Sequence, residues 1–197
     1  MKDLWAIVLA AGESKRMKTP KMLLPFRGKT IIQTTIGNIV DSEINNILVV
    51  LGAFAGEILT VIEDMPVNHC INDKYSRGML SSVQYGFRHL PSEYGAALVF
   101  PGDQPMIQAC LINKVIASYH KSGRGIVVPV WQGRRGHPLL IDNKYRKEIE
   151  LLDENVGLRA LARRYSRDVF EVVSDSPDII KDIDTKEDYL NEINKTG

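Results

Sequence analysis

The sequence predicts an α/β fold of three layers, in which a mostly parallel sheet lies between two layers of helices. Short apolar runs, many of them β-branched, alternate with longer amphipathic stretches along the 197 residues, which is the pattern of βαβ units. No internal repeat and no Pro-, Gly- or Ser-rich linker divides the chain. We therefore expect a single domain over residues 1–197.

Each short apolar run is expected to be a strand, and each amphipathic stretch a helix. The expected strands are Leu4–Leu9, Asn46–Leu51, Val67–Ile71, Ala96–Phe100, Gly125–Val130, His137–Ile141 and Val169–Val173. The expected helices are Thr30–Asp41, Ala55–Asp64, Leu80–Leu90, Ala109–Lys121, Lys144–Leu152, Val156–Arg164 and Lys186–Ile193. The alternation weakens after Gly133, because GRRGHP joins two strand-like runs with no helix between them. This segment predicts a hairpin, or a small mixed or antiparallel extension of an otherwise Rossmann-like sheet.

Ligands of open α/β sheets bind beyond the carboxyl ends of the strands. Three loops follow expected parallel strands: residues 9–21, 72–82 and 101–105. We expect these loops to meet at one edge of the sheet.

The composition excludes several partners. Lys and Arg number 25 against 24 Asp and Glu, so the net charge of +1 gives no reason to expect a nucleic acid or an anionic membrane as a partner. The cysteines, Cys70 and Cys110, are too few for a disulfide framework or a zinc site, which favours a reducing compartment. The apolar start could be a secretion signal, but Asp3 offsets Lys2 and the run is short, so we interpret it as a first strand of a cytoplasmic protein.

The tripeptide GKT at Gly28–Thr30 resembles the end of a phosphate-binding P-loop, but that motif requires glycine where Leu23 stands. The dinucleotide fingerprint GxGxxG also fails, since Glu13 and Ser14 follow Gly12. A turn followed by a helix N-cap is the interpretation of GKT that we prefer.

The loop LAAGESKRMKTPK, residues 9–21, is a better phosphate candidate. It follows the first strand, its Gly12 lets the backbone approach a ligand closely, and it carries four cationic side chains. Arg16 offers several donors in one plane, and Lys21 is a compact charge suited to a different phosphate. Composition alone also allows a solvated basic loop.

Several segments together resemble the MobA-like nucleotidyltransferases, and among them the molybdenum cofactor cytidylyltransferases. The string LAAGESKRMKTPKMLLPFRGKTII resembles the LAAGxSxRMGxxKxLLxxxGxxLL signature of that family. Further matching segments are PGDQP at 101–105, NDKYSRGMLSSVQYG at 72–86, GRRGHPLLI at 133–141 and DIDTKEDY at 182–189. The resemblance covers nearly the whole chain.

Three places depart from the family pattern, one of them Lys186, where the family's closing DIDTPEDY has proline. Lys18 stands where the family has glycine, which changes the freedom of the loop and adds a charge. Asn155 of ENVGLR replaces an acid of the family's GDxGAR, while Gly157 and Arg159 are kept.

The resemblance implies a reaction in which a phosphate monoester attacks the α-phosphorus of a nucleoside triphosphate and releases pyrophosphate. It places Arg16 on the β- and γ-phosphates and Lys21 on the α-phosphate, with Asp103 as the third catalytic residue. The nucleotide-binding residues that it implies are Leu9, Ala10, Ala11, Gly12, Ser14, Arg16, Lys21, Asn72, Gly78, Ser81, Ser82, Gly102 and Asp103. Ser81 and Ser82 are also explained as helix caps.

The resemblance also implies a Mg²⁺ cofactor. Asp103 is the first ligand that we expect, and Asp184 or Asp182 the second. Asp103 is alternatively a turn aspartate, and Asp184 or Asp182 the N-cap of the last helix.

Gln104, His137 and Arg159 are implied on the acceptor side, although a lone histidine is as often structural. Trp131 is a core residue or a stacking surface for a pterin. The LAAG sequence, with Ala11, resembles cytidylyl rather than guanylyl members, which favours CTP.

These expectations describe an enzyme that transfers CMP from CTP to a molybdopterin-type phosphate, with a molybdenum hydroxylase as the client that receives the product. Two alternatives remain open at this point. One is the same chemistry with GTP or another phosphorylated acceptor, and the other is a non-catalytic chaperone that binds nucleotide and cofactor.

Overall fold

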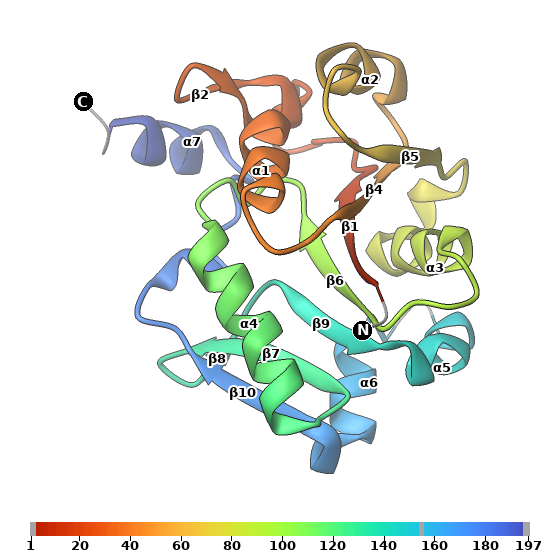
Figure 1. The fold of residues 1–197 in the computed structure, drawn as a ribbon. Helices are drawn as coiled ribbons and strands as arrows, with labels where there is room; N and C mark the ends of the chain where they lie inside the picture. The colour runs from red at the N-terminus through yellow and green to blue at the C-terminus, as the bar shows by residue number, and fades with distance from the viewer. Residues whose placement is uncertain (1–2, 154–155, 195–197) are drawn as a thin grey trace.

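A mostly parallel sheet between two layers of helices forms the protein (Figure 1). The computed structural model describes residues 3–153 and 156–194. The order of the main sheet is β10-β7-β9-β6-β1-β4-β5, with β8 paired to β7. Its strands are β1 (Leu4–Ala10), β4 (Asn46–Leu51), β5 (Asn68–Ile71), β6 (Ala96–Pro101), β7 (Ile126–Trp131), β8 (Arg134–Arg135), β9 (Leu139–Asp142) and β10 (Val169–Val173). The fold class predicted from the sequence is confirmed.

The two helical layers cover opposite faces of the sheet. The helices are α1 (Ile31–Val40), α2 (Ala55–Ile62), α3 (Met79–His89), α4 (Ala109–Ser122), α5 (Arg146–Glu150), α6 (Arg159–Arg164) and α7 (Lys186–Ile193). Short 3₁₀ turns are η1 (Lys21–Leu23), η2 (Tyr75–Arg77), η3 (Asn143–Tyr145), η4 (Ser166–Asp168) and η5 (Pro177–Ile180). None of the described helices is long and apolar enough to span a membrane.

The strands bury side chains on both faces, and the alternation of a pleated strand sends them to different helices. In β1, Ala6 and Val8 face the core formed with α1, α2 and α4, whereas Ile7 and Leu9 face the core formed with α3, α5 and α6. The apolar runs are therefore continuous rather than alternating in the sequence.

The antiparallel part of the sheet lies inside it rather than beyond it. β9 pairs antiparallel with both β6 and β7, while β7 and β10 pair parallel. The expected hairpin is present, since Val130 of β7 pairs with Arg135 of β8 through a turn in which Gln132 and Gly133 have positive φ. The antiparallel region is thus one inserted strand and its short hairpin, and not an extension at the edge.

The predicted elements agree with the structure except near residues 143–164 and 25–30. The two helices expected at Lys144–Leu152 and Val156–Arg164 are shorter, because the first begins as η3 and the second follows Gly157, which has φ +75. A small hairpin, β2 (Pro25–Phe26) with β3 (Lys29–Thr30), was not predicted. Thr30 caps α1 through a capping box with Gln33, so the interpretation of GKT as a turn and a helix cap is confirmed.

Gly52, directly after β4, lets two strand ends approach each other. A Cβ placed on Gly52 would lie 2.6 Å from the carbonyl oxygen of Ala11, and the same oxygen accepts a hydrogen bond from Ala53 N at 3.2 Å. No side chain fits there without moving the backbone that follows β1.

Replacing Gly52 with Ala should destabilise the protein by about 2 kcal/mol, since the added methyl meets backbone rather than a flexible side chain. Gly37 in α1 is the matched control, because a Cβ there meets nothing within 4 Å and Gly37→Ala should stabilise the helix by about 0.5–1 kcal/mol. Urea unfolding of both variants measures the two effects, and equal effects would contradict the close contact at Gly52.

Candidate active site

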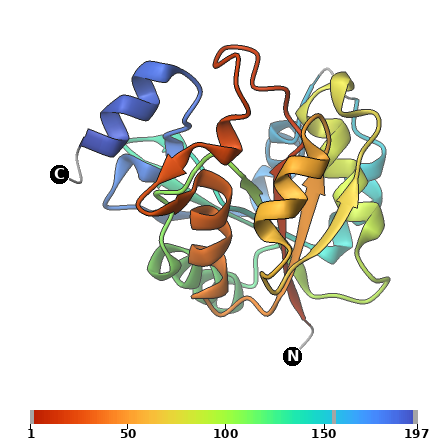
Figure 2. The same cartoon turned by 90° about the horizontal axis from the view of Figure 1, so that it is seen from above.

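The loops after β1, β5 and β6 meet at one edge of the sheet, as the sequence predicts. β1 pairs parallel with β4 and β6, and Gly102 N donates to Leu9 O at 2.9 Å just beyond the paired ends. Asn72 N donates to Leu51 O at 2.9 Å in the same way. Figure 2 shows the loop that follows β1 standing out from this edge, with α7 on one side and the region of β5 and α3 on the other.

The segment before α7 joins this edge from the far end of the sequence. Ile183 N donates to Asp103 O at 3.1 Å, and Tyr189 OH donates to Pro25 O at 2.7 Å. Ile183 is fully buried in a small core with Phe26 and Ile31. These contacts bring Asp182 and Asp184 to the loop after β6.

Lys21 is the centre of the charged cluster at this edge. Its side chain is 11 % exposed, and its Nζ donates both to Asp103 Oδ2 and, at 2.7 Å, to Asp184 Oδ1. The other oxygen of Asp184 accepts from Arg16 Nη2 at 2.6 Å. Residues far apart in the sequence, Arg16, Lys21, Asp103 and Asp184, therefore form one chain of ion pairs.

The pKa shifts in the cluster reflect burial and the sharing of charge. Burial lowers the pKa of Lys21, but Asp103 and Asp184 outweigh it, and the pKa stands above its ordinary value. Burial also opposes ionisation of Asp184, yet Lys21 and Arg16 hold the pKa of that carboxyl below its usual range. Burial keeps the pKa of Asp103 above its usual value in spite of Lys21, since Asp182 and Asp184 add like charge. Lys21 does not fully offset the burial of Asp103, because one ammonium is shared by two carboxylates.

Asp182 and Asp184 occupy different positions in the site. Asp182 Oδ1 accepts from Gln104 Nε2, whereas Asp184 is bound to the cations. Neither caps α7: the N-cap is Thr185, whose hydroxyl accepts from Asp188 N at 3.1 Å. The alternative that one of these aspartates is the helix cap is therefore wrong, because Thr185 already satisfies the first turn.

The carboxylate oxygens of Asp103 and Asp184 suit a hard divalent cation that also binds ligands from the substrate. Oxygens of Asp103 and Asp184 converge on one positive centre, the Lys21 ammonium. Mg²⁺ is held in proteins by one or two carboxylates together with phosphate oxygens of the substrate. Within residues 3–153 and 156–194, no group of three or more His, Cys, Asp or Glu side chains can hold a metal ion. The two carboxylates fit a divalent cation that also binds phosphate oxygens.

The loop after β1 is held in an unusual backbone conformation. Ser14 has φ 52 and Lys18 has φ 57, both in the left-handed region, and Ser14 O accepts from Met17 N and Lys18 N at 3.0 and 3.1 Å. Ser14 Oγ accepts from Lys21 N at 3.2 Å, so Ser14 fastens both parts of the loop. A glycine at position 18 would adopt this conformation without strain, which explains in physical terms the glycine of the family signature.

Replacing Lys18 with Gly should raise the free energy of unfolding by about 0.5–1 kcal/mol, since relief of the left-handed strain exceeds the added entropy of the unfolded chain. Thermal unfolding should show a Tm higher by roughly 2–3 °C. Lys15→Gly is the matched control at an exposed cation of the same loop that is not in the left-handed region, and there glycine should lower the Tm. A fall in both variants would contradict the strain at Lys18.

Most of the remaining predicted nucleotide residues near β1 are tightly packed, and Gly12 is not. Leu9, Ala10 and Ala11 are buried at the end of β1, and a Cβ placed on Gly102 would lie 2.9 Å from Leu9 O. A Cβ placed on Gly12 would meet nothing within 4 Å, so the space beside Gly12 is open.

Asn72, Ser81 and Ser82 form a closed hydrogen-bond network. Asn72 Nδ2 donates to the hydroxyls of Ser81 and Ser82 at 3.1 and 3.0 Å, and Ser81 Oγ donates to Gly78 O at 3.0 Å. The N-cap of α3 is Gly78, with φ +106 and no side-chain cap, so the interpretation of the serines as caps is wrong. The network fixes the start of α3 against the end of β5.

The predicted acceptor residues do not all lie together. His137 is partly exposed, its N donates to Ile179 O at 2.8 Å, and burial lowers the pKa of its imidazole to about 4 against the opposing charge of Asp103. Gln104 is 1 % exposed and follows Asp103 directly.

Arg159 begins α6, and within the described residues no hydrogen bond or ion pair joins it to the Lys21 cluster. Asn155 lies outside the described residues. Trp131 is partly buried at the end of β7.

A cleft of about 420 Å³ opens from the cluster toward α7. Its lining residues are Arg16, Ile180, Lys181, Asp182, Asp184, Asp188, Asn191 and Glu192. Asn191 and Glu192 were not predicted from the sequence motifs. They lie three and four positions after Asp188, on one face of a helix, so helical spacing was the signal that could have found them.

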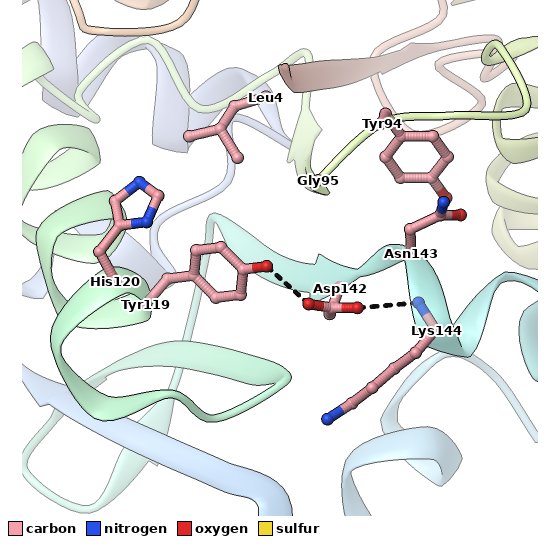
Figure 3. A pocket seen from close by; sticks show the side chains of 8 residues that line it. All are labelled: Leu4, Tyr94, Gly95, Tyr119, His120, Asp142, Asn143 and Lys144. Atoms are coloured by element: carbon pink, nitrogen blue, oxygen red, sulfur yellow. Dashed lines mark hydrogen bonds between the residues drawn. The ribbon is translucent and has the colours of Figure 1, made fainter. Parts of the chain in front are cut away.

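A second cavity, of about 460 Å³, lies at the opposite edge of the sheet (Figure 3). It is lined by residues at the start of β1 and the end of β9, among them Leu4 and Asp142, and Tyr119 OH donates to Asp142 Oδ2 at 2.6 Å inside it. Although it is the larger of the two, it contains none of the converging loops, and the Lys21 cluster is the candidate site.

Comparisons with known proteins find similar sequences over most of the chain. Residues 6–169 match the MobA-like NTP transferase domain family. The chain is 30% identical to nicotine blue oxidoreductase of Paenarthrobacter nicotinovorans, with 80% of each chain covered. It is 31% identical to a probable molybdenum cofactor guanylyltransferase of Natranaerobius thermophilus, over 76% of this chain and 73% of the relative. It is 26% identical to the molybdenum cofactor cytidylyltransferase of Escherichia coli, over 96% and 95% of the two chains.

Solved structures share the fold. The protein Rv0371c of Mycobacterium tuberculosis H37Rv superposes with a TM-score of 0.88 at 23% identity, covering 98% of both chains. Its complex with manganese superposes with a TM-score of 0.82 at 22% identity, also over 98% of both chains.

Proposed function

Because the chain belongs to the MobA-like NTP transferase family, we propose that it transfers CMP from CTP to the phosphate of a molybdopterin-type cofactor and releases pyrophosphate. The observation that carries the proposal is the convergence of Lys21 and Arg16 with Asp103 and Asp184 at the edge where the loops after β1 and β6 meet. This arrangement provides cations for phosphates and carboxylates for a divalent metal at the same place.

The chemistry needs two anions to be brought together. An oxygen of the acceptor phosphate attacks the α-phosphorus, the bond from that phosphorus to the bridging oxygen breaks, and pyrophosphate leaves with the electron pair. A phosphate monoester is already an anionic nucleophile near pH 7, so positioning and charge neutralisation supply most of the rate.

Lys21 and Arg16 differ in solvent exposure, and we assign them different roles for that reason. Lys21 is buried, and we assign it to the α-phosphate, where negative charge develops; the Arg16 side chain is 68% exposed and is assigned to the leaving pyrophosphate. Both are bound to carboxylates in the structure, so a nucleotide must take over these contacts. The open space beside Gly12 allows a close approach of backbone and nucleotide.

Asp103 and Asp184 are the residues that we expect to hold Mg²⁺, with Asp182 as the alternative to Asp184. The metal would neutralise charge on the phosphates and help to orient them. Manganese in a structure of the same fold supports a divalent cation in general. In this chain, Asp103 and Asp184 also hold Lys21 at the site, and Gln104 orients Asp182.

The choice of CTP rests on the resemblance of the LAAG sequence, with Ala11, to the cytidylyl rather than the guanylyl members of the family. The relatives include both a cytidylyltransferase and a probable guanylyltransferase, so membership of the family does not distinguish CTP from GTP. A molybdenum hydroxylase in the cytoplasm is the client that we propose for the product.

A redox function is the second candidate, because one relative at 30% identity is named an oxidoreductase. The pattern GxGxxG is missing from the loop after β1, since Glu13 and Ser14 follow Gly12. The cationic cluster suits phosphate transfer better than binding of a dinucleotide by backbone alone.

A nucleotide panel tests the proposal directly. The purified protein is incubated with molybdopterin-type cofactor, Mg²⁺ and each of CTP, GTP, ATP and UTP, and pyrophosphate is measured. Release with CTP above the others supports the proposal, and a preference for GTP would replace the nucleotide while keeping the chemistry. Tight cofactor binding without pyrophosphate from any nucleotide would favour the chaperone. Consumption of NADH or NADPH without pyrophosphate would favour the redox function.

A further inference from the structure

We propose that Lys18 is an additional phosphate-binding residue, which contacts the terminal phosphate of the nucleotide and so favours triphosphates over shorter nucleotides. The inference rests on the proposed function, because it assigns a further residue to the same nucleotide site. The family signature has glycine at this position, so the contact would distinguish this chain from relatives that follow the signature.

Three of the four loop cations pair with carboxylates of the chain. Lys15 pairs with Glu13 at 2.8 Å, Arg16 with Asp184 at 2.6 Å, and Lys21 with Asp103 and Asp184. Lys18 is exposed, and among the residues that the structure describes it has no carboxylate partner and no side-chain hydrogen bond. Its ammonium is the one loop cation available to an anion without first releasing a carboxylate of the described chain.

The backbone at Lys18 adopts the left-handed conformation. The φ of 57 costs a lysine about 1 kcal/mol that a glycine would not lose. Hydrogen bonds from Met17 N and Lys18 N to Ser14 O hold the loop in this shape. Strained backbone positions are concentrated at ligand-binding sites, where the side chain contributes to binding. For a lysine in this loop, that contribution is a positive charge for a phosphate.

The loop cations lie at different depths below the surface. Lys21 is buried at the base of the loop, the side chain of Arg16 is 68 % exposed, and Lys18 is exposed on the turn between them in sequence. Figure 2 shows this loop reaching outward from the edge of the sheet. A triphosphate whose α-phosphate lies at Lys21 extends outward past Arg16, so its terminal phosphate reaches the level of the exposed turn.

Equilibrium binding without acceptor tests the proposal, because no turnover then occurs. CTP, CDP and CMP are titrated in the presence of Mg²⁺ into the wild type and into Lys18→Asn, Lys18→Gly and Lys18→Arg, and GTP, GDP and GMP are used in parallel. Asn tolerates the left-handed conformation while removing the charge, so Lys18→Asn separates charge from strain. Lys15→Asn is the matched control, since it removes a neighbouring cation that already has a carboxylate partner.

Lys18→Asn and Lys18→Gly should weaken binding of the triphosphate about tenfold and that of the monophosphate less than twofold, with Lys18→Arg close to wild type. The weakening should shrink as salt is added, because the contact is an exposed charge pair. Equal losses for mono- and triphosphate, equal losses in Lys15→Asn, or no loss would overturn the role of Lys18 while leaving the nucleotidyltransferase intact. A wild type that binds none of these nucleotides would overturn the proposed function and this inference together.

Discussion

Replacing Asp103 with Asn should lower pyrophosphate release by about a thousandfold or more while the protein stays folded. Asp103 follows β6 directly, is 9% exposed and shares the Lys21 ammonium with Asp184. Asn keeps the shape of the side chain and can still accept a hydrogen bond from Lys21, but it removes the negative charge that a divalent cation requires. The loss should therefore appear in catalysis and metal binding, and little of it in packing.

Two measurements separate these effects. Binding of Mn²⁺ followed by electron paramagnetic resonance in the presence of CTP should weaken markedly in Asp103→Asn, and thermal unfolding should show a folded protein. Asp64, exposed after α2, provides a control, since Asp64→Asn removes one carboxylate far from the cluster in the fold and should leave both readouts unchanged. Wild-type turnover in Asp103→Asn would place the metal site elsewhere.

A comparison with Asp182→Asn and Asp184→Asn distinguishes the two candidates for the second ligand. Asp184 shares the Lys21 ammonium with Asp103, whereas Asp182 accepts from Gln104. We expect Asp184→Asn to weaken Mn²⁺ binding more than Asp182→Asn does. The reverse order would assign the second ligand to Asp182.

The sequence predicted the sheet well because local patterns decide it. Buried parallel strands such as β1 and β4 appear as continuous apolar runs, and Thr30 with Gln33 is recognisable as a capping box from four residues. The place of β9 between β6 and β7 was not predictable in this way. A short strand carries no local information about which neighbours it will pair with.

The candidate site was predictable in its residues but not in its contacts. The motifs located Arg16, Lys21 and Asp103 near one edge, since loops after parallel strands share that edge. They also placed Asp184 or Asp182 at the site as a metal ligand, but they did not predict the ion pairs of Asp184 with Lys21 and Arg16. These pairs depend on the docking of the segment before α7 through Ile183. In the sequence, the same DIDT segment is an equally good helix cap.

The structure holds the cations and carboxylates of the site against one another. Lys21 is bound to Asp103 and Asp184, and Arg16 to Asp184, so the cations and the carboxylates offset one another's charge. When nucleotide and metal enter together, the cations exchange carboxylates for phosphates and the carboxylates exchange ammonium for metal. Either ligand alone leaves charges without partners, and we therefore expect nucleotide and divalent cation to strengthen each other's binding.

Replacing Lys21 with Met should destabilise the protein by about 3 kcal/mol at pH 7, in addition to lowering turnover at least about a hundredfold. The change leaves Asp103 and Asp184 facing each other without the ammonium, in a site where burial already raises the pKa of Asp103. The Tm should fall by roughly 6–12 °C for a chain of this size. Lys15→Met, at a side chain 79% exposed, is the control and should change the Tm little.

The pH dependence of this loss has a definite sign. The pKa of Asp184 lies below its usual value in the folded protein, so its stabilising effect is present above the ordinary carboxyl pKa and is lost as the pH falls through the folded value. The pKa of Lys21 is raised, so its contribution is complete at pH 7 and would be lost only in strongly alkaline solution. The gap in stability between wild type and Lys21→Met should therefore be wide near pH 7, begin to narrow as the pH falls toward the ordinary carboxyl pKa of about 4, and narrow further below it, where Asp184 takes up its proton. Mg²⁺ should raise the Tm of Lys21→Met more than that of the wild type, because the ion then meets carboxylates that no ammonium holds. A gap that does not change with pH would show that Lys21 stabilises the fold through its alkyl chain rather than through Asp103 and Asp184.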